Sequence, residues 1–105
     1  MTMLRIKRII FGLSTRDVNT ISGVPMANIR KVETLSDDLI KNRGLLSSKQ
    51  RLETMYSNVY KIMSEKDKDD FDAAVRILSN TDFHKYIEPL FNFFDDGTNE
   101  GIDDD

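Results

Sequence analysis

The chain has 105 residues, no cysteine and a formal net charge of −3 at pH 7. This length accommodates one domain, or one domain with a small appendage, and it suffices to bury a modest hydrophobic core. The lack of cysteine excludes disulfides and thiolate metal sites and fits a reducing compartment. No stretch approaches the roughly 20 apolar residues of a membrane-spanning helix, so we expect a cytoplasmic protein with no membrane partner.

Charge is distributed unevenly along the chain. Residues 1–34 contain six basic and two acidic residues, a local charge of +4, whereas residues 35–105 contain nine basic and sixteen acidic residues, a local charge of −7. Phosphate binding depends on local positive potential rather than on net charge. The first third of the chain is therefore a candidate for a salt-sensitive contact with nucleic acid.

The first predicted element is an amphipathic helix from Leu4 to Phe11. Lys7 and Arg8 interrupt its apolar residues, and no cleavage site made of small residues follows. The segment is therefore predicted to be a helix of the mature protein rather than a signal peptide.

Residues 12–33 have the spacing of two short helices that cross at a tight turn. The apolar residues expected to face a shared interior are Val18, Ile21, Ile29 and Val32. Gly23 lies between the helices, where the chain must turn sharply and a side chain would restrict the backbone. The polar residues expected to face outward are Arg16, Asn28, Arg30 and Lys31. This layout is typical of a helix-turn-helix.

The same segment resembles the Cro/CI-type (XRE) helix-turn-helix family. The resemblance rests on Gly12-Leu13-Ser14, on Gly23-Val24 and on Val32-Glu33, preceded by an amphipathic helix. Two positions depart from the family pattern. Asn19 replaces the usual alanine in the close contact between the two helices, and Pro25 replaces the usual serine or threonine cap, although proline is tolerated at a helix start.

The resemblance implies a lambda-repressor-like fold and a homodimer that binds a double-stranded DNA operator. Such proteins act as transcriptional repressors or autoregulators, often in phages, plasmids and other mobile elements. The resemblance also places five recognition-helix residues against the major groove or its flanking phosphates: Met26, Ala27, Asn28, Arg30 and Lys31. Thr15 and Arg16, at the start of the preceding helix, are placed near a phosphate. Arginine and lysine suit guanine or phosphate, asparagine suits adenine, and methionine or alanine packs on a thymine methyl.

Three further helices are predicted before residue 80. A short one spans Ser36 to Gly44, and a longer one is capped by Ser47 or Ser48 and carries the apolar stripe Leu52, Met55, Tyr56, Val59, Ile62 and Met63. A charged run at Asp67–Asp70 then separates this helix from a third, which ends near Ser79-Asn80 and whose apolar face is Phe71, Ala74, Val75 and Leu78.

An aromatic-rich segment from Phe83 to Phe94 is predicted to form a last helix, which Pro89 kinks or ends. Its aromatic face suits either the core or a dimer surface, and we assign Phe91 and Phe94 to dimerisation. Residues 95–105, acidic and glycine-containing, are predicted to be disordered.

Together these elements predict an all-α protein with three regions. Residues 1–42 form the helix-turn-helix region, residues 43–94 complete the core and mediate dimerisation, and residues 95–105 form an acidic tail.

No pattern in the sequence indicates catalysis, so we expect no enzyme, no catalytic residue, no metal and no cofactor. His84 is the only histidine, which excludes a Cys/His zinc site, and no nucleophile is indicated for a triad. The aspartates of residues 67–72 lack the glycine and closing glutamate of a calcium loop.

The sequence leaves one alternative function open. The sixteen acidic residues after Thr34 also suit an inhibitor or antirepressor that binds a protein partner through its acidic C-terminal part.

Overall fold

The structure is a computed structural model that describes residues 2–80, 82, 86 and 89. In that part of the chain it consists of five α-helices and one short 3-10 helix, with no strand, which confirms the predicted all-α class. The elements are α1 (Met3–Ile10), α2 (Thr15–Ser22), α3 (Met26–Thr34), η1 (Asp37–Leu39), α4 (Arg43–Lys61) and α5 (Glu65–Leu78).

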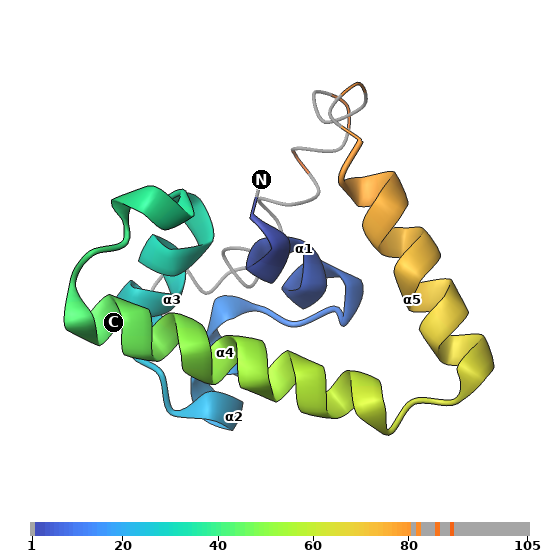
Figure 1. The fold of residues 1–105 in the computed structure, drawn as a ribbon, viewed down its shortest axis with the longest axis horizontal. Helices are drawn as coiled ribbons and strands as arrows, with labels where there is room; N and C mark the ends of the chain where they lie inside the picture. Colours follow the sequence, from blue (N-terminus) through green and yellow to red (C-terminus); the bar gives the residue numbers. More distant parts are fainter. Residues whose placement is uncertain (1, 81, 83–85, 87–88, 90–105) are drawn as a thin grey trace.

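The long helix α4 runs along one side of the molecule, and the other helices are arranged around it (Figure 1). α3 packs against both α4 and α2, while α1 packs against α3, α4 and α5. α3 and α5 lie at opposite ends of the molecule, with α1 between them (Figure 1).

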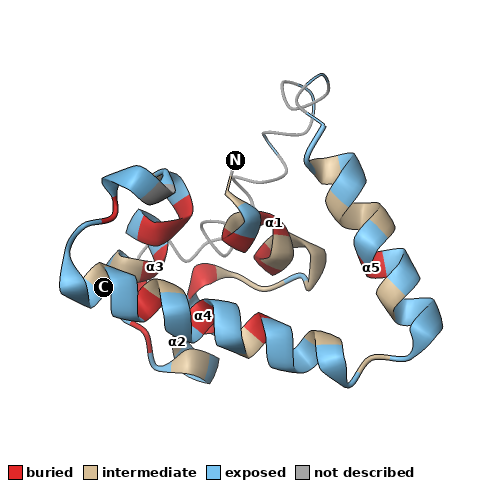
Figure 2. Ribbon diagram, in the orientation of Figure 1, coloured by how far each residue is buried: buried red, intermediate tan, exposed pale blue. Residues whose placement is uncertain are grey.

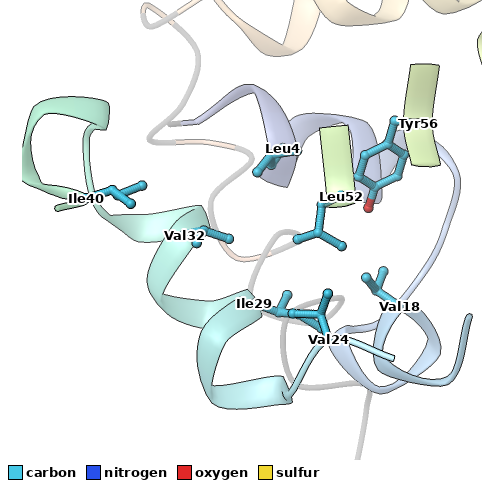
Figure 3. Packing of buried hydrophobic residues seen from close by; sticks show 8 residues of the cluster. All are labelled: Leu4, Val18, Val24, Ile29, Val32, Ile40, Leu52 and Tyr56. Atoms are coloured by element: carbon cyan, nitrogen blue, oxygen red, sulfur yellow. The ribbon is translucent and has the colours of Figure 1, made fainter. Parts of the chain in front are cut away.

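The hydrophobic core lies where α1, α2, α3 and α4 meet (Figure 3). Its buried residues are Leu4, Val18, Val24, Ile29, Val32, Ile40, Leu52 and Tyr56. Complete burial of one aliphatic side chain of this size stabilises a fold by about 1.5–3 kcal/mol, so this cluster is the main source of stability. Buried residues are far sparser in α5, where Phe71 is the buried residue (Figure 2).

The first and fifth helices follow local signals in the sequence. α1 begins after Thr2, whose side chain accepts a hydrogen bond from the Arg5 amide. α5 begins after Ser64, whose Oγ accepts a hydrogen bond from the Asp67 amide at 3.1 Å. The charged run predicted to separate two elements is therefore part of α5, while the predicted end near Ser79 agrees with the observed end.

The segment between α3 and α4 differs from the prediction of a short helix over Ser36 to Gly44. Only η1 is helical there, and Gly44 lies in the first turn of α4. The Asn42 side chain accepts a hydrogen bond from the Leu45 amide at 3.1 Å and so caps α4 five residues before Ser47. Ser48 does not cap the helix, because it is a buried residue within it.

Three apolar residues that were expected to be interior are exposed: Ile21, Val59, which is 37% exposed, and Ile62. Ile21 is 61% exposed, because the chain turns directly after α2 and Val24 fills the interior in its place. Ile62 is 84% exposed at the C-terminal end of α4. The α4 stripe is therefore buried at Leu52 and Tyr56 but not at its far end.

Several predictions fall outside the described residues. These concern the helix over residues 83–94 apart from Tyr86 and Pro89, and so include Phe91 and Phe94, together with the tail over residues 95–105 and His84. Among the described helices, none combines the length and the apolar content that crossing a bilayer would require.

Candidate nucleic-acid interface

The start of α2 is held by a reciprocal pair of hydrogen bonds. Ser14 Oγ accepts from the Asp17 amide at 3.0 Å, and Asp17 Oδ2 accepts from the Ser14 amide at 2.9 Å. This capping box satisfies two backbone donors that a helix start leaves without partners. It therefore defines where Thr15 and Arg16 lie at the first turn of α2.

The turn between α2 and α3 depends on Gly23. Its φ of +78° lies in the left-handed region that side chains disfavour, as the sequence predicted. Its amide donates to the Asn19 carbonyl at 2.8 Å and closes α2. Ser22 Oγ donates to the Val18 carbonyl at 2.6 Å and accepts from the Val24 amide at 3.1 Å, so it bridges the last turn of the helix and the residue after the glycine.

Asn19, which departs from the family pattern, contributes to this turn. Its Nδ2 donates to the Val24 carbonyl at 2.8 Å, which adds a side-chain bond that alanine could not make. From the other side, Arg51 of α4 donates from Nη1 to the Ser22 carbonyl at 3.2 Å. The turn is thus supported by α2 and by α4.

α3 divides into a buried face and an exposed face. Its buried residues are Met26, Ile29, Val32 and Glu33, and its exposed residues include Ala27, Arg30 and Lys31. Arg30 and Lys31 follow Ala27 by three and four positions, so these residues lie on one side of the helix. Arg16 on α2 is exposed as well. The predicted outward orientation of Arg16, Arg30 and Lys31 is therefore confirmed.

The other predicted contact residues are less accessible. Thr15 is 2% exposed and Met26 is 8% exposed, which leaves each of them little side-chain surface for DNA. Asn28 is half-buried, and its Nδ2 donates to Ser48 Oγ of α4 at 3.1 Å. The candidate interface therefore consists mainly of Arg16, Ala27, Arg30 and Lys31, with Asn28 at its edge toward α4.

A buried ion pair, which the sequence analysis missed, joins α1 to the end of α3. Arg8 is completely buried and Glu33 is 4% exposed; Arg8 Nε lies 2.8 Å from Glu33 Oε2, and Arg8 Nη2 lies 2.9 Å from Oε1. Arg8 Nη1 also donates to the Leu13 carbonyl at 3.0 Å, and Thr2 Oγ1 donates to the Glu33 carbonyl at 2.8 Å. Two parallel bonds between a guanidinium and a carboxylate restrict distance and orientation, so this pair positions α3 against α1.

A signal for this pair was present in the sequence. Arg8 follows Leu4 by one helical turn, and Glu33 follows Ile29 by one helical turn, so each charge continues an apolar face. Charged residues of opposite sign on the buried faces of two neighbouring helices indicate a buried pair.

Tyr56 of α4 completes the polar part of this interior. Burial raises the pKa of its hydroxyl well above the usual range; the Glu33 carboxylate raises it further, and the Arg8 guanidinium acts in the opposite direction. The hydroxyl oxygen is buried and has no hydrogen-bond partner among the described residues.

The ion pair removes one charge of each sign from the surface of residues 1–34. The five basic residues left there are Arg5, Lys7, Arg16, Arg30 and Lys31, opposed by Asp17, so the segment keeps its charge of +4.

No family model, curated protein or solved structure matches this chain. Its own residues and their geometry therefore carry the functional assignment.

Proposed function

We propose that the chain is a sequence-specific DNA-binding protein in which α3 is the recognition helix of a helix-turn-helix. The observation that carries this proposal is the exposed face of α3, where Ala27, Arg30 and Lys31 lie together on a helix whose other face is buried. An α-helix fits the major groove of B-form DNA, and the base edges there distinguish all four base pairs.

The chemistry of these residues suits a nucleic-acid contact. Arg30 and Lys31 supply donors for guanine edges or phosphates, Asn28 supplies an amide for adenine, and Ala27 is small enough to approach a thymine methyl. Arg16 at the start of α2 adds a cation for the flanking phosphates. Thr15 and Met26 act through the placement of α2 and α3, since both are buried.

The contacts that hold α3 favour recognition of base sequence over non-specific attraction to phosphate. The ion pair between Arg8 and Glu33 and the turn at Gly23 hold the two ends of the helix. Base discrimination requires side chains whose backbone is held in one position, whereas attraction to phosphate does not.

A single recognition helix reads only a few base pairs, so we propose that the protein acts as a homodimer and as a repressor or autoregulator. Two copies would place their recognition helices about 34 Å apart, one turn of DNA. Phe91 and Phe94 remain the proposed dimer residues and lie outside the described part of the chain. Light scattering of the protein alone and with operator DNA tests this, and a monomer in both samples would contradict it.

The decisive test of the interface replaces Arg30 and Lys31 with alanine and measures binding to DNA from upstream of the protein's own gene across a salt series. We expect each substitution to cost about 1–3 kcal/mol where the side chain contacts a base, or to lower the salt slope by about one where it contacts a phosphate. The matched control removes two cations from α5, Lys66→Ala with Arg76→Ala, and should leave base-dependent binding unchanged. Unchanged binding in the α3 double variant would exclude α3 from the interface.

A second function is favoured by the charge of α5. This helix contains three basic residues and five acidic ones. The acidic residues are all exposed: Glu65, Asp67, Asp69, Asp70 and Asp72. Such a surface suits a basic protein partner, as an inhibitor or antirepressor would require. Pull-down of cellular proteins, run beside the DNA titration, separates the two functions, because the second needs a captured basic protein and no DNA binding.

A further inference from the structure

Ser48 of α4 lies directly behind the proposed recognition helix. It is 8% exposed, and its Oγ accepts the hydrogen bond from Asn28 Nδ2 at 3.1 Å. The bond connects the first turn of α3 with the second turn of α4, over twenty positions of sequence. Asn28 is thus partly accessible and at the same time bonded to a neighbouring helix through its side chain.

In the structure, Nδ2 rather than Oδ1 of the Asn28 amide faces Ser48 Oγ. An asparagine amide has two hydrogens on Nδ2 and two lone pairs on Oδ1. The bond to Ser48 uses one hydrogen, and the second hydrogen and Oδ1 have no partner among the described residues. One donor and one acceptor side by side are what adenine N7 and the adenine N6 amino group require in the major groove.

We propose that Ser48 is a positioning residue for adenine recognition: it holds the Asn28 amide so that Nδ2 donates to adenine N7 while Oδ1 accepts from the adenine amino group. This inference rests on the proposed function and names one base class that the site distinguishes. Ser48 itself contacts no DNA and acts through Asn28 alone. Without the bond, the amide rotates between its two orientations, and the reversed orientation presents its donor and acceptor to the wrong adenine atoms.

The test selects binding duplexes from a pool with a randomised central segment, using the full chain, and compares four variants with wild type: Asn28→Ala, Ser48→Ala, the double variant, and Ser47→Ala. Ser47 is the matched control, because it is the exposed neighbour on the same helix and loses the same hydroxyl. Binding to one fixed duplex of unrelated sequence measures the non-specific affinity of each variant. The melting temperature of each protein variant checks its fold.

We expect wild type to select an adenine at one position of each half-site and Asn28→Ala to lose that preference. Ser48→Ala should lower the preference at the same position by about tenfold and leave the non-specific affinity unchanged. The double variant should match Asn28→Ala, and Ser47→Ala should match wild type.

Three results overturn the inference while DNA binding stands. These are an adenine preference in Ser48→Ala equal to that of wild type, an equal loss at every position of the site, and no position that depends on Asn28. If wild type binds no duplex at all, the proposed function itself is wrong and this inference fails with it.

Discussion

The α2–α3 unit and α5 are attached to the rest of the molecule in different ways. The α2–α3 unit contributes Val18, Ile29 and Val32 to the core and is further held by polar bonds to α1 and α4. α5 buries one residue, Phe71, whose ring lies 5.3 Å from that of Phe11 and 5.6 Å from that of Tyr60. A hydrogen bond from Tyr60 to Asp72, at 3.0 Å, adds an exposed link between α4 and α5.

This difference indicates which end of the molecule requires defined geometry. Apolar contacts fix proximity, whereas hydrogen bonds between ionised groups also fix direction. The directional bonds gather around α3, where the exposed cations lie, and α5 is attached mainly by aromatic contacts. Four predictions test this contrast.

The largest effect is expected for Arg8→Ala. The substitution removes the guanidinium that pairs with the buried Glu33 carboxylate, which costs about 3–5 kcal/mol of unfolding free energy. Urea denaturation followed by circular dichroism measures it.

The control is the double variant Arg8→Met with Glu33→Leu, which leaves no buried charge and should recover most of the stability. If the double variant is as unstable as Arg8→Ala, packing by the arginine side chain, and not the ion pair, is what stabilises this junction.

A smaller and more local effect is expected for Phe71→Ala. Removal of the buried ring should lower the free energy that holds α5 on α1 by about 2–4 kcal/mol, because few other apolar contacts replace it. Amide hydrogen exchange should show faster exchange in α5 while α2 and α3 keep their protection. Ile77→Ala, at a residue 66% exposed on the same helix, should leave exchange unchanged. Equal loss of protection in α3 would show that the two ends of the molecule unfold as one unit.

Gly23→Val is expected to destabilise the α2–α3 unit by about 1–2 kcal/mol. The cost comes from the backbone, since a Cβ at this position would meet Arg51 Nη1 only at 3.7 Å, an ordinary contact distance. Gly23→Asn is the control, because asparagine tolerates the left-handed conformation better than valine does. Equal melting temperatures for the valine variant and wild type would contradict a strained turn.

Gly23 also shows what the sequence could predict. The turn, α1 and the exposure of Arg30 and Lys31 follow from patterns within about ten residues, where helical periodicity and glycine chemistry act locally. The cap of α4 was predicted at the wrong residue, since Asn42 and the two serines have similar capping preferences and local sequence does not rank them. In the structure Ser48 is buried within the helix, and Asn42 supplies the cap.

The residues missed by the sequence analysis depend on contacts across long stretches of chain. Arg8 and Glu33 are 25 positions apart, and their pairing depends on how α1 crosses α3. In the same way, Ile21 has the spacing of an interior residue, yet its exposure is decided by the path of the chain after Gly23. Local periodicity identifies the face of a helix but not how far the neighbouring helix extends over it.

The smallest effect is expected for Tyr56→Phe. Since the hydroxyl is buried without a hydrogen-bond partner among the described residues, its removal should change the stability at neutral pH by less than about 1 kcal/mol, or increase it slightly.

The difference between Tyr56→Phe and wild type appears at alkaline pH. The folded-state pKa of Tyr56 lies above the unfolded value of 10.0, so its contribution is fully present below pH 10.0 and is lost as pH rises from there toward the folded-state pKa, because only the unfolded chain then releases the proton. Tyr56→Phe should therefore lose less stability than wild type as the pH rises above 10.0, measured by urea denaturation at each pH. Tyr60→Phe is the comparison, because its pKa is raised chiefly by the hydrogen bond to Asp72 at an exposed position, and it should leave most of the wild-type alkaline loss in place. An alkaline loss that is the same in wild type and Tyr56→Phe would mean that Tyr56 ionises as readily in the folded protein as in the unfolded chain, and that the α1–α3–α4 junction admits water.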